Sequence, residues 1–264
     1  MKEGPADRFL WSRVIGDSSR RYMSVRRHIL AALLIGFGLN LGVSARAAEG
    51  VPFSGSRPTV PRPDRLSEVV EPAFRDVVTR VLNKPTITAS GSNGDVACTA
   101  EQYAWMLDHP DRVALAWKRL HVPCVDIAST GEGKFVWTDE NGSEVVWQTV
   151  GRLKDGLVWY ATGKVKPSGV LPTVPVKAVA VITRRESTNA KGEKVLQPVA
   201  QVFLLTESRG ASLILRMLGP TAPKLAEQGA EQLLFFFNGV GNHISRNPEQ
   251  IDQLLAPAKT SGGR

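Results

Sequence analysis

A long amphipathic segment near the C-terminus, residues 221–244, constrains the fold of this chain more than any other feature. Its apolar residues recur every three or four positions, so on a helix they form one stripe, with polar residues mainly on the other side. The stripe consists of Leu225, Gly229, Leu233, Phe236, Phe237, Val240 and Ile244. Because a helix must bury such a stripe against another layer, we expect a sheet to fold around this helix.

The segment between residues 125 and 206 supplies that sheet, because its apolar residues alternate with a period of two. The dipeptides Asn141-Gly142 and Asp155-Gly156 predict hairpin turns, and the polar segment Arg184 to Lys194 predicts a longer connection. The predicted strands are Val125–Ala128, Lys134–Thr138, Glu144–Leu153, Leu157–Val165, Val176–Thr183 and Val199–Thr206. The short connections favour an antiparallel meander.

Shorter elements precede these strands. A helix is predicted from Leu66 to Leu82, with a kink or a new start at Pro72, and a short strand from Pro85 to Ala89. Thr99, followed three residues later by Gln102, is typical of a capping box at the start of a helix.

A second short helix is expected to begin at Pro110, because proline is favoured in the first turn of a helix, and to end near Leu120. The order of elements is therefore one strand, two short helices, about six strands and one long helix. We predict an α+β fold in which a curved antiparallel sheet of six to seven strands grips the C-terminal helix.

The N-terminal region has the pattern of a secretory signal. An apolar run from Ile29 to Val43 follows Arg26 and Arg27 and precedes Ala45-Arg46-Ala47, which predicts cleavage after Ala47. Translation can start at Met1 or at Met23. The run is shorter than the roughly 20 residues that span a bilayer, and an uncleaved anchor is the alternative.

The remainder divides into three parts. We predict a proline-rich linker over residues 48–64, a single domain over residues 65–255 and a disordered tail over residues 256–264. The domain is expected in the periplasm or outside the cell, and it would contact a membrane only through an uncleaved leader.

The positive charge of the chain lies mostly in the leader. Residues 1–47 hold eight of the 33 basic and three of the 25 acidic residues, so the remainder has a net charge of only +3. No basic cluster interleaved with aromatic residues follows the leader, and the composition does not indicate a nucleic-acid partner.

Cys98 and Cys124 are the two cysteines of the chain. In an oxidising compartment an even count favours a disulfide, which in this loop would contribute roughly 3.5 kcal/mol. Two free thiols are the alternative. Without a matching pair of histidines the cysteines do not predict a metal site.

The order of elements resembles the helix-grip, or START-like, superfamily of lipid binders, hydrophobic-ligand binders and polyketide cyclases. The resemblance covers residues 84–246 and includes the helix pair around Leu107-Asp108-His109-Pro110. It implies a curved sheet around the C-terminal helix, and it assigns no catalytic residue. The cone-shaped fold of the nuclear-transport-factor type is the alternative, although that fold normally ends on strands.

Large aromatic residues recur along the predicted sheet and on the C-terminal helix. If they point inward they line an apolar pocket between sheet and helix, and otherwise they fill the core. The candidate lining residues are Trp137, Trp147, Trp159, Phe203, Leu233, Phe236 and Phe237.

These observations predict an exported domain that holds a small hydrophobic ligand or lipid and needs no cofactor or metal. The alternatives are a closed-core structural or interaction protein of the cell envelope, and a cyclase-type or hydrolase-type enzyme on the same scaffold. We identify no catalytic residue in the sequence, and the oligomeric state stays open.

Overall fold

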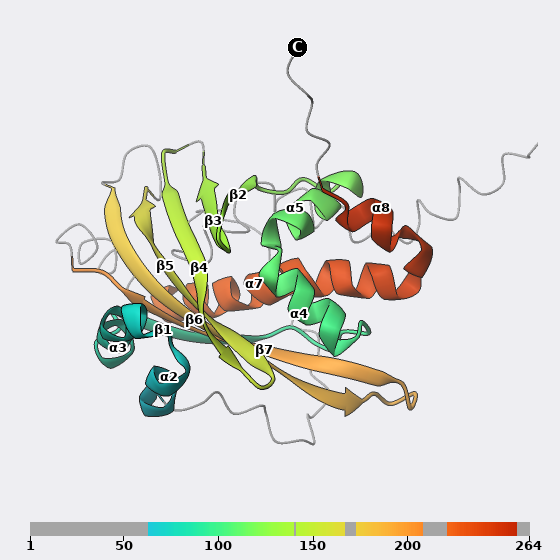
Figure 1. Cartoon of the computed structure of the whole chain (residues 1–264), viewed down its shortest axis with the longest axis horizontal. Coiled ribbons are helices and arrows are strands. Elements are labelled where there is room, and N and C mark those ends of the chain that lie inside the picture. Colours follow the sequence, from blue (N-terminus) through green and yellow to red (C-terminus); the bar gives the residue numbers. More distant parts are fainter. Residues whose placement is uncertain (1–62, 140, 167–172, 208–220, 258–264) are drawn as a thin grey trace, which may run out of the picture.

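The computed structural model describes residues 63–139, 141–166, 173–207 and 221–257. Within them, one antiparallel sheet has the strand order β1-β7-β6-β5-β4-β3-β2 (Figure 1). Its strands are β1 (Ile87–Ser92), β2 (Ile127–Gly131), β3 (Lys134–Thr138), β4 (Glu144–Leu153), β5 (Gly156–Val165), β6 (Val174–Thr188) and β7 (Lys194–Leu205). The predicted meander is confirmed for β2 to β7, and β1 is added to the sheet beside β7.

The helices lie on both faces of this sheet. The long C-terminal helix is α7 (Thr221–Arg246), and Figure 1 shows it crossing the sheet, with α4 and α5 beside it. The remaining helices are α2 (Pro63–Val69), η2 (Pro72–Phe74), α3 (Arg75–Asn83), α4 (Ala100–Asp108), α5 (Pro110–Arg119), η3 (Pro248–Gln250) and α8 (Ile251–Leu255). The predicted α+β class, with a curved sheet, a long C-terminal helix and two short helices after the first strand, is confirmed.

Two hydrophobic cores share the sheet as a common wall. On β6, Ala178, Ala180 and Ile182 belong to the core under α7. Val179 and Val181, which alternate with them, belong to the core under α2 and α3. Successive side chains of a strand point to opposite faces, so residues 178–182 of β6 form a continuous apolar run that is buried on both sides.

The face opposite α7 is covered by α2, η2 and α3. Pro72 interrupts the helix that the apolar spacing predicts from Leu66 to Leu82, because proline lacks the N–H that an internal position requires. Here the chain pairs with the end of β4 through an antiparallel bridge between Val70 and Gly151. A Cβ atom on Gly151 would lie 2.9 Å from the Val69 carbonyl oxygen, so only glycine allows this close approach.

On the other face, α7 packs directly on β1. A Cβ atom on Gly91 would lie 2.6 Å from the Glu231 nitrogen and 2.9 Å from the Ala230 Cβ. The strand was predicted to end at Ala89, but it continues to Ser92. Glycine is present here because the helix backbone comes close to the strand, not because the chain turns.

The two short helices begin as predicted. The Thr99 side chain accepts a hydrogen bond from the Gln102 main-chain nitrogen (3.2 Å), and the Gln102 side chain accepts one from the Thr99 nitrogen (2.9 Å). This reciprocal pair is the capping box. Pro110 occupies the first turn of α5.

The connection between β6 and β7 differs from the prediction. Arg184 to Lys194 was expected to be a loop, but most of it continues the two strands as a polar ribbon that projects past the others (Figure 1). Asn189 ends the ribbon, because its side-chain oxygen accepts hydrogen bonds from the nitrogens of Lys191 (2.9 Å) and Glu193 (3.0 Å). Charged side chains on both faces hide such a ribbon from hydrophobic-pattern analysis.

Several predictions fall outside the described residues: the signal peptide, most of the linker and most of the tail. Residues 63 and 64, assigned to the linker, belong to α2. Among the described helices, none is both long enough and apolar enough to cross a membrane.

Candidate functional site

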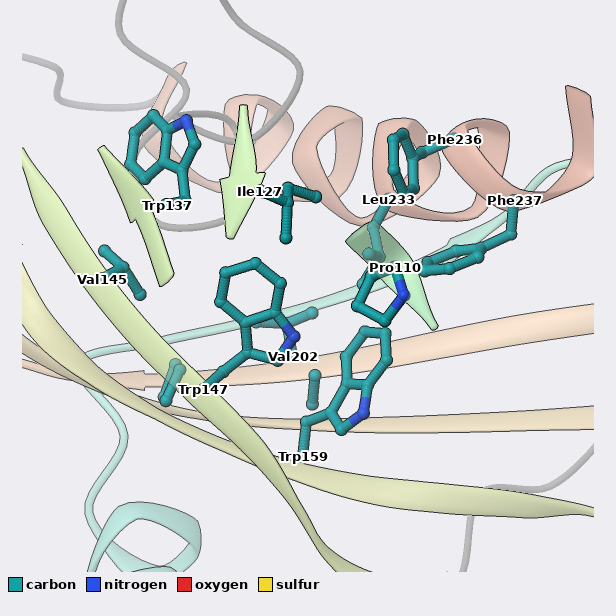
Figure 2. Close-up of a pocket in the computed structure, with 13 residues that line it drawn as sticks. Pro110, Ile127, Trp137, Val145, Trp147, Trp159, Val202, Leu233, Phe236 and Phe237 are labelled. Carbon is teal, nitrogen blue, oxygen red and sulfur yellow. The ribbon is translucent and has the colours of Figure 1, made fainter. Parts of the chain in front are cut away.

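An apolar cavity lies between the sheet, α7 and the beginning of α5 (Figure 2). Its volume is about 40 Å³, measured as the space open to the centre of a water molecule. That volume would accommodate about three waters. The lining residues are Pro110, Ile127, Trp137, Val145, Trp147, Trp159, Ala161, Ala178, Ala180, Val202, Leu233, Phe236 and Phe237.

Small side chains in the middle of the sheet make room for this cavity. The register places Ala161 of β5 opposite Ala178 of β6, and Trp159 of β5 opposite Ala180. Each alanine fills far less of the space under α7 than a leucine or phenylalanine would. The cavity therefore has a floor of alanines and valine, and this floor is bordered by tryptophans.

The roof of the cavity comes from one stripe of α7. Leu233, Phe236 and Phe237 are all buried, with 1 to 3% of each residue exposed. The rings of Phe236 and Phe237 meet edge to face with centroids 4.9 Å apart, and the Phe237 ring lies 5.8 Å from that of Trp159. Aromatic contacts thus join the helix to β5 at one end of the cavity.

A polar contact with α5 holds α7 at the position of the roof. The indole N–H of Trp117 donates a hydrogen bond of 3.0 Å to the Phe236 carbonyl oxygen. The Trp117 ring also stacks on Phe235, with centroids 5.9 Å apart. Both contacts fix the part of α7 that carries the roof residues.

A buried chain of hydrogen bonds, away from the cavity, ties α4 and the end of β1 to α7. The Tyr103 hydroxyl donates to the Asn238 side-chain oxygen (2.9 Å), and the Asn238 amide donates to the Asn93 carbonyl oxygen (2.8 Å). Burial raises the pKa of Tyr103, so its hydroxyl stays protonated and continues to donate. This chain is structural, because Tyr103 and Asn238 do not line the cavity.

The three tryptophans of the lining differ in their hydrogen bonding. The Trp159 indole N–H donates to the Thr149 hydroxyl at 3.1 Å. The indole nitrogens of Trp137 and Trp147 are buried, and neither has a hydrogen-bond partner among the described residues. A buried donor without a partner costs about 1 to 3 kcal/mol, which makes two of them in one cavity a feature that needs an explanation.

Six of the seven residues predicted to line a pocket lie together around the cavity: Trp137, Trp147, Trp159, Leu233, Phe236 and Phe237. Phe203 is a correction, because it points to the other face of β7 and packs in the core under α2 and α3. Its neighbour Val202 faces the cavity instead. Phe203 was chosen as a lining residue because its side chain is large and aromatic. Alternate side chains of β7 point to opposite faces, however, and Val202 is the one on the cavity side.

Sequence analysis missed the small lining residues. Ala178 and Ala180 stand two positions apart on one strand, a spacing that puts both on the same face. A pair of alanines at this spacing within a buried strand is the signal that could have located the floor of the cavity. Pro110 and Ile127 were missed because they reach the cavity only through the tertiary arrangement of α5 and β2.

The predicted disulfide is a second correction. Cys98 and Cys124 are both free thiols in the structure. Cys98 is packed against α7, where a Cβ atom on Gly241 would lie 3.1 Å from its sulfur. Burial raises the pKa of each thiol to about 12, which keeps both protonated and unreactive at neutral pH.

The chemistry available at the cavity is that of an apolar surface with two unused donors. None of its lining residues has an ionisable side chain. In the described part of the chain, no group of three or more His, Cys, Asp or Glu residues is arranged to hold a metal ion.

Comparison with known proteins gives weak likenesses. No protein-family profile matches the chain, and no curated protein matches it at a significant level. Among solved structures, a conserved protein from Geobacillus kaustophilus is similar at a TM-score of 0.39 and 14% identity, covering 60% of this chain and 97% of that chain. The di-domain ARO/CYC StfQ from the steffimycin biosynthetic pathway is similar at a TM-score of 0.31 and 15% identity, covering 65% of this chain and 53% of that chain. These similarities are too low to assign a function.

Proposed function

We propose that this protein binds a small apolar molecule in the cavity between its curved sheet and α7. The observation that carries the proposal is the cavity itself, a concave, partly open space whose lining residues are all apolar apart from indole N–H groups. Apolar, concave sites of this kind are typical of small-molecule binding.

The cost of the empty cavity supports this proposal over a closed core. An unfilled space of about 40 Å³ lowers stability by roughly 1 kcal/mol at 24 cal/mol per Å³. A ligand would recover the contacts that the lining residues lack when the cavity is empty.

The size of the cavity narrows the class of ligand. It is smaller than the engineered cavity of about 150 Å³ that takes up benzene, so a ligand has to displace part of the lining. We therefore propose a one-ring or short-chain molecule rather than a lipid with two acyl chains.

Two variants of neighbouring residues test the site. Ala178→Leu fills the cavity from the floor, whereas Val179→Leu enlarges a buried side chain on the same strand but on the opposite face. Both are expected to cost about 1 to 3 kcal/mol of stability through overpacking. Only Ala178→Leu should abolish uptake of small aromatic probes such as sec-butylbenzene, measured by equilibrium dialysis.

Native mass spectrometry of protein purified from its own host is the complementary experiment. A co-purifying apolar molecule that is lost in Ala178→Leu and kept in Val179→Leu would support the proposal. The proposal is wrong if no such molecule is present and the wild type takes up no aromatic probe.

We also propose, from the sequence pattern of residues 1–47, that the chain is exported and cleaved after Ala47. The intact mass of the protein recovered from host cell fractions tests this. A mature chain that begins at Ala48 in the exported fraction supports it, and a full-length chain in the cytosol contradicts it.

A further inference from the structure

Two unpartnered donors line the cavity. Trp137 and Trp147 are 2% and 6% exposed, and neither indole nitrogen has a hydrogen-bond partner among the described residues. An indole nitrogen can only donate, so its one requirement is an acceptor. Trp159, in the same lining, already meets this requirement through Thr149.

The sheet brings the two tryptophans together but turns their donors different ways. Trp137 of β3 pairs with Val145 of β4, and Trp147 follows Val145 by two positions on the same face, so the two residues are diagonal neighbours. In Figure 2 the indole nitrogen of Trp137 is on the ring edge directed away from Trp147. In Figure 2 the indole nitrogen of Trp147 is on the ring edge directed toward Pro110 and Trp159, across the cavity.

The absence of charged side chains in the lining limits which acceptor groups can bind there. A carboxylate in this cavity would lose its hydration without meeting a cation, because no lining residue is ionisable. A ketone, ester or ether oxygen carries no net charge and loses far less hydration. A hydrocarbon would leave both donors unpaired.

We infer that the ligand is a neutral apolar molecule with at least one acceptor oxygen, to which the indole N–H of Trp147 donates a hydrogen bond. This inference rests on the proposed function, since it names the chemistry of the molecule that the cavity binds. It assigns to Trp147 a recognition role in addition to its packing.

Three probes of one-ring size separate the chemistry. Methyl benzoate is a neutral ester, sec-butylbenzene is a hydrocarbon with the same number and connectivity of heavy atoms, and benzoate is an anion. Equilibrium dialysis gives a dissociation constant for each. Benzoate is expected to bind at least tenfold more weakly than methyl benzoate at pH 7, because its charge would be buried without a partner.

Two tryptophan variants isolate the contribution of the N–H group. Trp147→Phe removes an unpaired N–H, and Trp159→Phe removes a similar part of a ring from the same cavity together with an N–H that Thr149 already accepts. In Trp147→Phe the affinity for methyl benzoate relative to sec-butylbenzene should fall about tenfold. In Trp159→Phe this ratio should stay within about twofold of wild type.

A second readout needs no variant. In a ¹H–¹⁵N spectrum of the wild type, methyl benzoate should shift the indole N–H signal of Trp147 downfield, while sec-butylbenzene should not. If both probes bind with the same indole shifts, or if Trp147→Phe weakens both equally, the inference is overturned and the proposed function stands. If no probe binds the wild type, the proposed function fails and the inference fails with it.

Discussion

The indole nitrogen of Trp117 on α5 lies 3.0 Å from the carbonyl oxygen of Phe236 on α7, and the ring covers the position where a Cβ atom on Gly239 would stand. That Cβ would lie 2.4 Å from two carbons of the ring. Trp117 thus fixes both the distance of α7 from α5 and the rotation of α7 about its axis, and α7 forms the roof of the cavity. The small size of Gly239 is a condition for this contact.

Replacing Gly239 with alanine should destabilise the protein. In a free helix this change stabilises by up to about 1 kcal/mol, but here the new methyl group meets a packed ring, and we expect a net loss of about 1 to 3 kcal/mol. Urea unfolding measures the difference. The Gly239→Ala and Trp117→Leu changes should cost less together than the sum of their separate effects, since leucine vacates the space. A stabilised Gly239→Ala variant would show that Trp117 does not rest there.

Loss of the capping box should weaken the start of α4. Thr99→Ala removes the acceptor for the Gln102 nitrogen and should lower the free energy of unfolding by about 1 kcal/mol. Thr99→Ser keeps a hydroxyl in the same place and should lose less than half of that. Equal losses in the two variants would argue against the cap as the cause.

The two faces of β7 should respond differently to substitution. Phe203→Leu changes the core under α2 and α3, so it should cost about 1 kcal/mol and leave the dissociation constant of sec-butylbenzene within about twofold of wild type. Val202→Ala widens the cavity floor and should change that constant by more than about threefold. Equal effects on binding would contradict the assignment of the two faces.

Stability should fall at alkaline pH because of the buried thiol of Cys98 and the partly buried thiol of Cys124. Burial raises the pKa of Cys98 and Cys124 from 9.0 to about 12, so in this interval the unfolded thiols ionise while the folded ones stay protonated. The unfolded state then binds fewer protons, and the free energy of unfolding falls by up to about 1.4 kcal/mol per pH unit for each thiol. This contribution is fully present below pH 9. Cys98→Ala should reduce the slope between pH 9 and 11 relative to wild type, and an unchanged slope would contradict the burial of this thiol.

Thiol titration tests the correction of the disulfide. Denatured protein prepared without reductant should show two reactive thiols, while the folded protein at pH 8 should react at least tenfold more slowly, because both thiolates are suppressed. Absence of reactive thiols in the denatured protein would restore the original prediction of a disulfide.

Local signals in the sequence predicted much of this fold. The 3.6-residue period gave the long helix, the Asn-Gly and Asp-Gly dipeptides gave two hairpins, and Thr99 with Gln102 gave the start of α4. Each of these signals acts over a few neighbouring residues. They can therefore be recognised in the sequence without knowledge of the tertiary structure.

The parts that could not be predicted depend on contacts between distant segments. The close approach of Ala230 makes Gly91 part of a strand, and a change of one position along β7 separates Phe203 from the cavity. The unpaired indole nitrogen of Trp147 is the clearest case. Whether this donor finds an acceptor depends on the positions of residues that are distant in sequence, so the sequence around Trp147 does not predict it.

Because α2, η2 and α3 cover one face of the sheet, they affect how far the chain can be shortened from its N-terminus. The sheet face beneath them carries Val150, Val158, Val179, Val181 and Phe203, all nearly inaccessible to solvent. A chain shortened to begin at residue 84 would keep the residues of the cavity and of the long helix. It would, however, expose this sheet face to water as one continuous apolar surface. Such surfaces drive self-association. The helices α2, η2 and α3 therefore cover an apolar sheet face that would favour self-association if it were exposed.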